Sequence, residues 1–211
     1  MSAETSQTLD RGLRVLRTLA DSPQGMTITD LAHRIDVNRT VVYRLVATLE
    51  QHGLARRDAA GRLHVGLGVL ALTRGLQPVL RSLATPVLRS LAEEVGSTAH
   101  LTIADGPEGL AIAVVEPSWT DYHVAYRVGA RHPLHEGAGG RAILLQRRDD
   151  PSPYVESVGE IQAGAHGVAA PVRGVEGLEA SVGLVSLDGL DAGAVGPKLV
   201  DAARSVARLL S

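Results

Sequence analysis

Two arginines, a threonine and a tyrosine stand close together at Arg39, Thr40, Tyr43 and Arg44. On a helix, residues four apart lie one above the other, so Arg39 would stack with Tyr43 and Thr40 with Arg44. Guanidinium groups bond to guanine edges and to phosphates, and hydroxyl groups bond to the oxygens of a nucleic-acid backbone. These residue types at this spacing predict a surface that binds double-stranded DNA.

The element that must position these side chains is a helix over residues 39–51. Its sequence divides into a polar half and an apolar half, the latter formed by Val41, Val42, Leu45, Val46 and Leu49. Asn38 is a suitable N-cap, and Gly53 supplies the left-handed residue that ends many helices. An amphipathic helix with a plain solvated face would show the same division, so the neighbouring segments must decide between the two readings.

The neighbours favour DNA binding. Residues 28–35 predict a short helix with Thr27 as its N-cap and Asp30 three residues later, an acidic variant of the capping box. A tight turn at Asp36 then leads into the second helix, which is the helix-turn-helix arrangement. Residues 54–65 predict two strands around an Asp-Ala-Ala-Gly turn, as in the wing of a winged helix. The candidate DNA-binding residues are Thr29, Asn38, Arg39, Thr40, Tyr43, Arg44, Arg56, Arg57 and Arg62.

Composition narrows the possible classes. The 211 residues can form two small domains, and the absence of cysteine excludes disulfides, thiol catalysis and thiolate metal sites. The net charge is −2, but residues 1–74 carry ten arginines against seven acidic residues, whereas residues 75–211 carry eleven basic residues against sixteen acidic ones. A basic DNA-binding domain attached to an acidic one would have this distribution. No apolar run is long enough to span a membrane, and the start of the chain is too polar for a signal peptide, so we expect a cytoplasmic, nucleoid-associated protein.

The segment after the wing predicts connecting helices. We expect a first helix near residues 67–76 and a second over 78–95 that breaks or kinks at Thr85, because Pro86 fits the first turn of a new helix better than the middle of an old one. Gly96 would end the second helix. Its apolar stripe is wider than the winged helix alone can cover, which leaves two alternatives open: packing on a second protomer, or packing within the same chain.

The remaining sequence predicts an α+β fold, an antiparallel sheet with packed helices. The expected strands are Thr98–Ala104, Gly109–Glu116, Tyr122–Val128, His166–Val172 and Ala180–Leu187, and the expected helices are Gly139–Arg147 and Ala192–Leu210. Residues from Pro151 to about Gly164 are expected to be irregular. The domain organisation is therefore a winged helix-turn-helix over residues 8–66, connecting helices over 67–96, and an α+β domain over 97–211.

Three groups of motifs resemble the IclR family of bacterial transcriptional regulators. They are Leu31–Arg34, Arg39–Thr40 and Tyr43–Leu49, then Thr85–Gly96 continuing into Ala99–Leu101, and finally Arg131–His135, Gly139–Ala142 and Gly167–Arg173. The resemblance implies a winged helix, a linker helix, and a GAF-like, PAS-like domain that binds a small-molecule metabolite effector and supports oligomerisation. It also implies a homodimer that can pair into a homotetramer on operator DNA, with the effector changing operator affinity.

This sequence departs from the family in two places. Only residues 148–165 stand where the family has a helix and an extended arm, and Gly183 and Val185 take the pocket side of the late strand, where the family carries serines. These changes favour an apolar or larger effector over a carboxylate. The residues that the resemblance places at the effector are His100, Leu134, His135, Gly137, Ala138, Gly139, Gly167, Val168, Ala169, Gly183 and Val185.

Other chemistry has weaker support. The run Gly137–Ala142 superficially matches a dinucleotide fingerprint, but it does not directly follow a strand in a parallel βαβ unit. His132 and His135, with His123 and His166 elsewhere, lack the carboxylate pattern of a metal site. We therefore expect no cofactor, no metal, no catalytic residue and no membrane partner. One alternative function stays open: an interaction or sensor module whose winged helix binds protein and whose second domain is vestigial or enzymatic.

Overall fold

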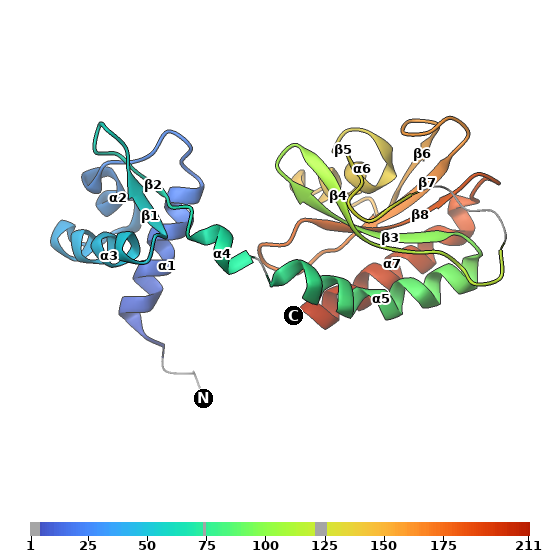
Figure 1. Ribbon diagram of the computed structural model, residues 1–211, viewed down its shortest axis with the longest axis horizontal. Coiled ribbons are helices and arrows are strands. Elements are labelled where there is room, and N and C mark those ends of the chain that lie inside the picture. The colour runs from blue at the N-terminus through green and yellow to red at the C-terminus, as the bar shows by residue number, and fades with distance from the viewer. Residues whose placement is uncertain (1–4, 74, 121–125) are drawn as a thin grey trace. The chain divides into compact units, whose positions relative to one another are not determined.

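The computed structural model describes residues 5–73, 75–120 and 126–211 (Figure 1). Contacts within the chain separate two compact units, Met1–Gly75 and Leu76–Ser211, called unit 1 and unit 2 below. None of the helices in these described ranges is long and apolar enough to cross a membrane.

Unit 1 is a winged helix-turn-helix, as predicted. In chain order its elements are α1 (Gln7–Ala20), α2 (Ile28–Ile35), α3 (Arg39–Gln51), β1 (Ala55–Arg57), β2 (Leu63–Val65) and α4 (Val69–Thr73). The sequence also sets the helix ends, because the Thr27 hydroxyl accepts from the Asp30 amide at 3.1 Å and the Asn38 side chain accepts from the Thr40 amide at 2.9 Å. Asp36 closes α2 in the left-handed conformation, which makes the turn into α3 tight.

The wing is attached to the helices through one buried residue, Leu63. Strands β1 and β2 pair antiparallel, and Met26 exchanges two backbone hydrogen bonds with Leu63 at 2.7 and 3.0 Å. The Leu63 side chain is fully buried with Val15, Leu31 and Val46. The three helices and the wing therefore share one core, which fixes the wing next to α3.

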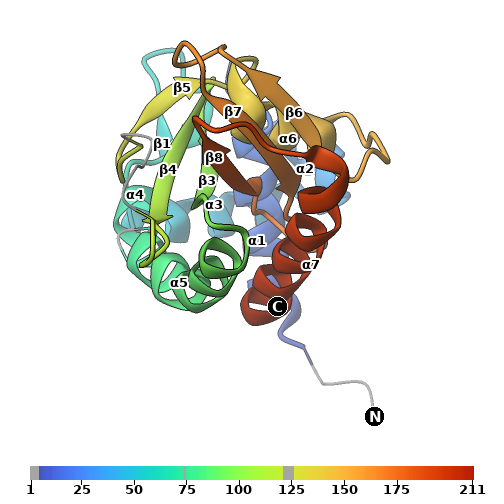
Figure 2. The same ribbon diagram turned by 90° about the vertical axis from the view of Figure 1, so that its right-hand side faces the viewer.

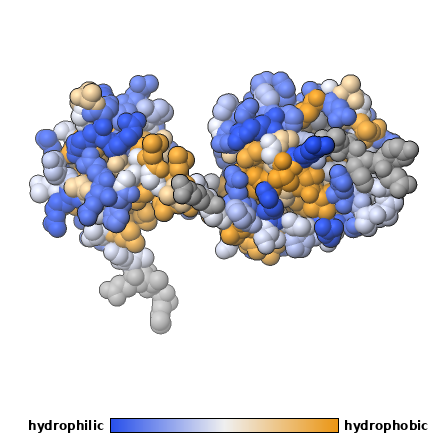
Figure 3. Space-filling model, in the orientation of Figure 1, coloured by the Kyte–Doolittle hydropathy of each residue, from blue (hydrophilic) through white to orange (hydrophobic). Residues whose placement is uncertain are grey.

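The face of α1 that packs on this core does not include all of the leucines of the helix. Val15 and Leu19 are buried, whereas Leu9 and Leu13 are 62% and 50% exposed. Exposed leucines are also found at and beside α4, which has no buried residue. In Figure 3, apolar residues gather on the side of unit 1 that carries α4.

Of the two alternatives predicted at Thr85, a break or a kink, the break is wrong. Helix α5 (Leu76–Val95) runs through Pro86 without interruption, and the Thr85 hydroxyl donates to the Arg81 carbonyl at 2.7 Å instead of capping a new helix. Pro86 lacks the amide that would complete one turn, which costs stability in a helix interior. The cost is tolerated because Ala84, Leu88 and the following turns of α5 are buried against the sheet of unit 2.

Unit 2 is an antiparallel α+β domain, as predicted. Its strands are β3 (Thr98–Asp105), β4 (Glu108–Val115), β5 (Arg131–Pro133), β6 (Val155–Val158), β7 (His166–Pro171) and β8 (Ala180–Ser186), arranged in the order β5-β4-β3-β8-β7-β6. Helices α5 and α7 (Ala192–Leu210) lie side by side on one face of the sheet, and α6 (Gly137–Arg147) lies on the other (Figure 2).

Two short strands were not predicted. Strand β6 lies inside the segment expected to be irregular, and β5 lies in the loop before α6; each is an edge strand with only one neighbour. The strand expected over Tyr122–Val128 falls largely on residues 121–125, which include His123 and lie outside the described residues. Residues 126–128 form no strand.

Successive side chains along each strand lie on opposite faces of the sheet and so belong to two different layers. Ala99, Leu101, Val182 and Leu184 join the core beneath α5 and α7. Residues of opposite parity on the same strands face α6, among them His100, which pairs across the sheet with Gly183. The α6 side of the sheet is therefore where polar side chains of unit 2 are brought together.

Candidate nucleic-acid interface and ligand pocket

The outer face of α3 presents the four side chains from which the prediction started. Arg39, Thr40, Tyr43 and Arg44 are all exposed, and together with Ile28 they line a shallow hollow on the surface. Within the described part of the chain, neither Arg39 nor Arg44 has a hydrogen bond or an ion pair to its guanidinium group. Both charged groups are therefore available to a ligand outside the protein.

Thr29 and Asn38 extend this surface around the turn of the helix-turn-helix motif. Together with Arg39 they line a second shallow hollow, beside His33 and Asp36. The Asn38 side-chain oxygen is engaged in capping α3, so its amide NH₂ group is the part left for an outside acceptor.

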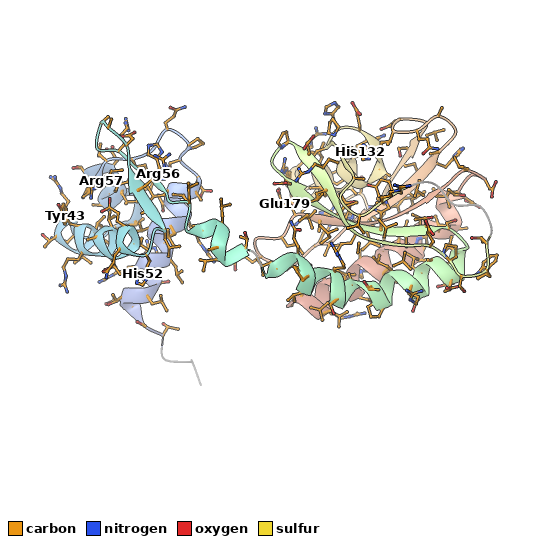
Figure 4. The ribbon with its side chains drawn as sticks, in the orientation of Figure 1. Tyr43, His52, Arg56, Arg57, His132 and Glu179 are labelled. Carbon is orange, nitrogen blue, oxygen red and sulfur yellow. The ribbon has the colours of Figure 1, made fainter. Side chains whose placement is uncertain are left out.

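The three wing arginines differ in what they contact. The Arg57 Nε bonds to the Glu50 carboxylate at 2.9 Å, and its guanidinium lies 5.7 Å from the ring centre of Tyr43. Arg62 donates to the Gly25 carbonyl at 3.2 Å, which ties the wing to the loop before α2. Only Arg56, among these three, has no partner in the described residues. Figure 4 shows Tyr43 on α3 and Arg56 and Arg57 on the neighbouring β1.

Asp58 organises the turn of the wing. Its carboxylate accepts from the amides of Ala60 and Arg62, each at 2.9 Å, and bonds to His64 Nε2 at 2.9 Å. The bond to His64, followed by the one to the Arg62 amide, lowers the pKa of Asp58 below its ordinary value. The turn is therefore held in one shape by an ionised side chain.

Unit 2 contains a cavity of about 330 Å³ between the sheet and α6. Four of the predicted effector residues line it: His100, Gly139, Gly167 and Val185. The other lining groups were not predicted. The most polar of these are Thr102, Tyr126, His132, Glu136, Ser157, Glu160 and Gln162. Several of them come from β6 and the loop after it, the segment whose sequence had suggested no structure.

The remaining predicted effector residues lie around the cavity or away from it. Val168 faces the opposite layer, because its parity on β7 directs it into the core beneath α5 and α7. The His135 side chain is 76% exposed at the surface. The others are buried but do not line the cavity: Leu134, Gly137, Ala138, Ala169 and Gly183. Gly183 is needed there, because a Cβ would lie 2.3 Å from His100 Nε2.

His100 is the most deeply buried titratable group of this site. It is 5% exposed, its Nδ1 lies 3.0 Å from the Thr102 hydroxyl, and its ring centre is 4.9 Å from that of Tyr126. Burial, with a smaller contribution from nearby His132, lowers the pKa of His100 to about 4. The ring is therefore neutral at physiological pH.

This lowered pKa predicts an acid sensitivity of unit 2. A histidine with an ordinary pKa of 6.5 in the unfolded chain binds more protons there than in the fold, so the stability is complete above 6.5 and is lost as the pH falls toward 4. We expect His100 to lower the free energy of unfolding by about 3 kcal/mol over this range. Urea titrations of wild type and His100→Gln at several pH values measure this, and equal pH dependence in both would contradict it.

The start of α6 is capped by residues from the other side of the cavity. The Gly137 amide donates to Glu160 Oε2 at 2.8 Å and the Ala138 amide donates to the Ser157 hydroxyl at 2.9 Å, whereas Glu136, at the N-cap, makes no such bond through its side chain. These partners are about 20 residues apart in sequence, so no local pattern could have revealed them. The glycine run that matched a dinucleotide fingerprint opens this helix in an antiparallel sheet, which is not the parallel βαβ unit that the fingerprint requires.

Comparison with known proteins agrees with this architecture. Residues 8–59 match the model of the IclR helix-turn-helix domain, and residues 77–159 match that of the bacterial transcriptional regulator IclR C-terminal domain. The HTH-type transcriptional regulator KipR of Bacillus subtilis is 28% identical over 180 residues, which cover 84% of this chain and 71% of KipR.

Two other curated relatives are matched over about half of their length. The transcriptional repressor IclR of Escherichia coli is 29% identical, with 68% of this chain and 54% of the relative covered. The HTH-type transcriptional regulator BhcR of Paracoccus denitrificans is 34% identical, with 66% of this chain and 50% of the relative covered.

Solved structures show the same fold. An IclR-family regulator from Rhodococcus aligns with a TM-score of 0.60 at 20% identity, covering 100% of this chain and 95% of that one. An IclR homologue from Microbacterium hydrocarbonoxydans, solved with 4-hydroxybenzoate, aligns with a TM-score of 0.54 at 21% identity, covering 97% and 99%. The fold, the order of the motifs and both family models agree: the chain belongs to the IclR family of bacterial transcriptional regulators.

Proposed function

We propose that this protein binds operator DNA through α3 and the wing of unit 1, and that a small molecule in the cavity of unit 2 changes its affinity for that DNA. The observation that carries the proposal is the pair of exposed guanidinium groups, Arg39 and Arg44, which have no partner within the described residues. An isolated pair of cations on one face of a helix is suited to guanine edges and phosphates.

The residues divide into two roles within this proposal. Arg39, Arg44, Thr40 and Tyr43 contact the major groove, and Arg56 contacts a phosphate from the wing. Because Arg57 and Arg62 already have internal partners, they mainly hold the wing in place beside α3. The proposal gives the chain no enzymatic role and places it at the nucleoid, where its operator would be.

A homodimer is the form that we propose for DNA binding. Two-fold symmetric dimers bind two half-sites about one helical turn apart. Unit 1 exposes a set of leucines on and near α1 and α4 that its own core does not use: Leu9, Leu13, Leu67, Leu70 and Leu72. A second copy of this chain would cover them, and two such dimers could share one operator as a tetramer.

The proposed regulation requires the effector to bind one arrangement of the protein better than another. A coupling free energy of about 1–3 kcal/mol is typical of such regulators and would change operator affinity roughly 5- to 150-fold. Helix α5 belongs to the core of unit 2 and directly follows unit 1 in sequence, so a change in the position of α5 is the simplest way to pass the signal on.

The test is binding of the full chain to the intergenic DNA upstream of its own gene, titrated over salt. Phosphate contacts release counterions, so we expect affinity to fall steeply as salt rises, and we expect a symmetric footprint. A random fragment of equal length is the control. Binding no tighter than to that fragment would favour the alternative, in which the winged helix contacts another protein.

A further inference from the structure

The anion-binding position at the start of α6 is already filled by the protein itself. Free amides at a helix N-terminus attract negative charge, and here the Gly137 amide meets the Glu160 carboxylate at 2.8 Å. Glu160 is also held by Arg141 at 2.7 Å. Ile161, next in the chain, packs so closely over Gly137 that a Cβ there would lie 2.3 Å from its Cδ1.

The charges around the cavity also disfavour an anion. Two carboxylates line it, those of Glu136 and Glu160, and among the described residues no lysine or arginine does. His100 provides no compensating charge, because it is buried and neutral. Arg141, the nearest cation that Glu160 contacts, is already paired.

One wall of the cavity suits a flat molecule. The rings of His100 and Tyr126 lie 4.9 Å apart, and those of Tyr126 and His132 lie 5.9 Å apart with only 18° between their planes. All three side chains line the cavity, so a further ring bound there can pack against them through offset or edge-to-face contacts. The cavity volume of about 330 Å³ has room for a molecule of one or two rings.

One polar atom in this wall lacks a partner. His132 Nε2 is buried and makes no hydrogen bond with any described residue. A buried polar atom without a partner costs free energy. The atom itself is covered by its surroundings, so His132 contributes to the cavity lining through the rest of its ring.

We propose that the cavity binds a small uncharged ring compound, and that Glu160 excludes free carboxylates by occupying the start of α6. This inference rests on the proposed role of the cavity as the effector site. Glu160 thus acts as a specificity residue: it takes the place that the charged group of an acidic ligand would need.

Matched pairs of amide and acid test this selectivity. The probes are benzamide and benzoate, 4-hydroxybenzamide and 4-hydroxybenzoate, and nicotinamide and nicotinate, measured by ligand-observed NMR on the full chain at pH 7.5. We expect at least one amide to bind wild type ten or more times as tightly as its acid. An acid that binds wild type as tightly as its amide would overturn the proposal, and so would the failure of every amide to bind.

Variants separate the role of Glu160 from general repulsion. Glu160→Ala frees the Gly137 amide and leaves Arg141, which still donates to the Glu156 carbonyl at 3.1 Å, without its carboxylate partner. We therefore expect acids to gain at least tenfold in affinity while amides change little. The control Glu136→Gln removes one charge from the same cavity without opening the helix start, since the Glu136 side chain caps nothing, and should change acid binding less than threefold. An equal gain in both variants, or in neither, would remove Glu160 from its proposed role.

Two further measurements keep the outcomes distinct. The first is the fluorescence of Trp119, which shows whether each variant remains folded. Within unit 2 its indole Nε1 donates to the carbonyl of Glu93 on α5 at 3.1 Å. Operator binding without any probe is measured on the same samples. Failure of the wild type to bind operator DNA more tightly than a random fragment would overturn the proposed regulator, whereas ligand selectivity in the free protein is decided by the NMR experiment alone.

Discussion

Replacing Arg39 and Arg44 together by alanine is expected to abolish specific operator binding while leaving the protein folded. Each arginine that makes a bidentate base contact supplies about 1–3 kcal/mol of discrimination, so losing two corresponds to about 2–6 kcal/mol, or roughly 30-fold to more than 10,000-fold in affinity. Neither side chain supports the fold, because both are exposed and have no partner in the described residues. Fluorescence anisotropy with labelled operator DNA measures the loss.

A matched double variant, Arg89→Ala with Arg204→Ala, removes the same charge from exposed positions on α5 and α7 of unit 2. It should bind operator DNA nearly as well as wild type. If the two double variants lose affinity equally, the effect would come from total charge, and α3 would have no special role. If Arg39→Ala with Arg44→Ala binds as tightly as wild type, the DNA-binding assignment fails.

Leu88→Ala is expected to destabilise unit 2 by about 2–5 kcal/mol, the usual range when a fully buried leucine leaves a cavity. Leu88 is 0% exposed and lies on α5 among the side chains that cover the sheet. Urea unfolding followed by Trp119 fluorescence measures this loss, because the only tryptophan of the chain belongs to unit 2 and bonds to α5.

Leu209→Ala, near the end of α7, is the control, since Leu209 is 49% exposed. It should change the free energy of unfolding by less than about 0.5 kcal/mol. Similar small losses in both variants would mean that α5 is a separate connector and not a part of the core of unit 2. The result therefore also tests where the boundary between the two units lies.

Much of unit 1 followed from the sequence because its signals are local. The cap at Thr27, the cap at Asn38 and the apolar half of α3 each involve residues within a few positions of one another, and the structure has all three. The arginines of the wing show where such reasoning ends. Sequence placed all three on the hairpin, but only packing decided that Arg57 turns to Glu50 and Arg62 to Gly25, leaving Arg56 free of any partner among the described residues.

The same division holds in unit 2. Hydrophobic periodicity predicted strands β3, β4, β7 and β8 and helices α6 and α7, with a period of about two in the strands and about 3.6 in the helices. The pattern is clear because these elements bury one face or both. It missed β5 and β6, since short edge strands have one neighbour and little burial to pattern them. It also predicted a break or a kink in α5 at Thr85. The helix does not break there, because the local cost of Pro86 is outweighed by burial against a sheet whose position no neighbouring residue reveals.

The sequence by itself determined the family, the winged helix-turn-helix fold of unit 1, the α+β fold of unit 2, and the face of α3 that carries Arg39 and Arg44. These features follow from motifs, caps and periodicity, which act over a few residues. Tertiary structure alone decided the character of the ligand cavity. Its carboxylate at Glu160 and its hydroxyl at Ser157 come from β6 and the loop after it, whereas His132 comes from β5 at the opposite edge of the sheet. They line one cavity only when the whole sheet has formed with α6 packed on it. Such a site depends on which strands become neighbours, and that is settled by the packing of the whole domain.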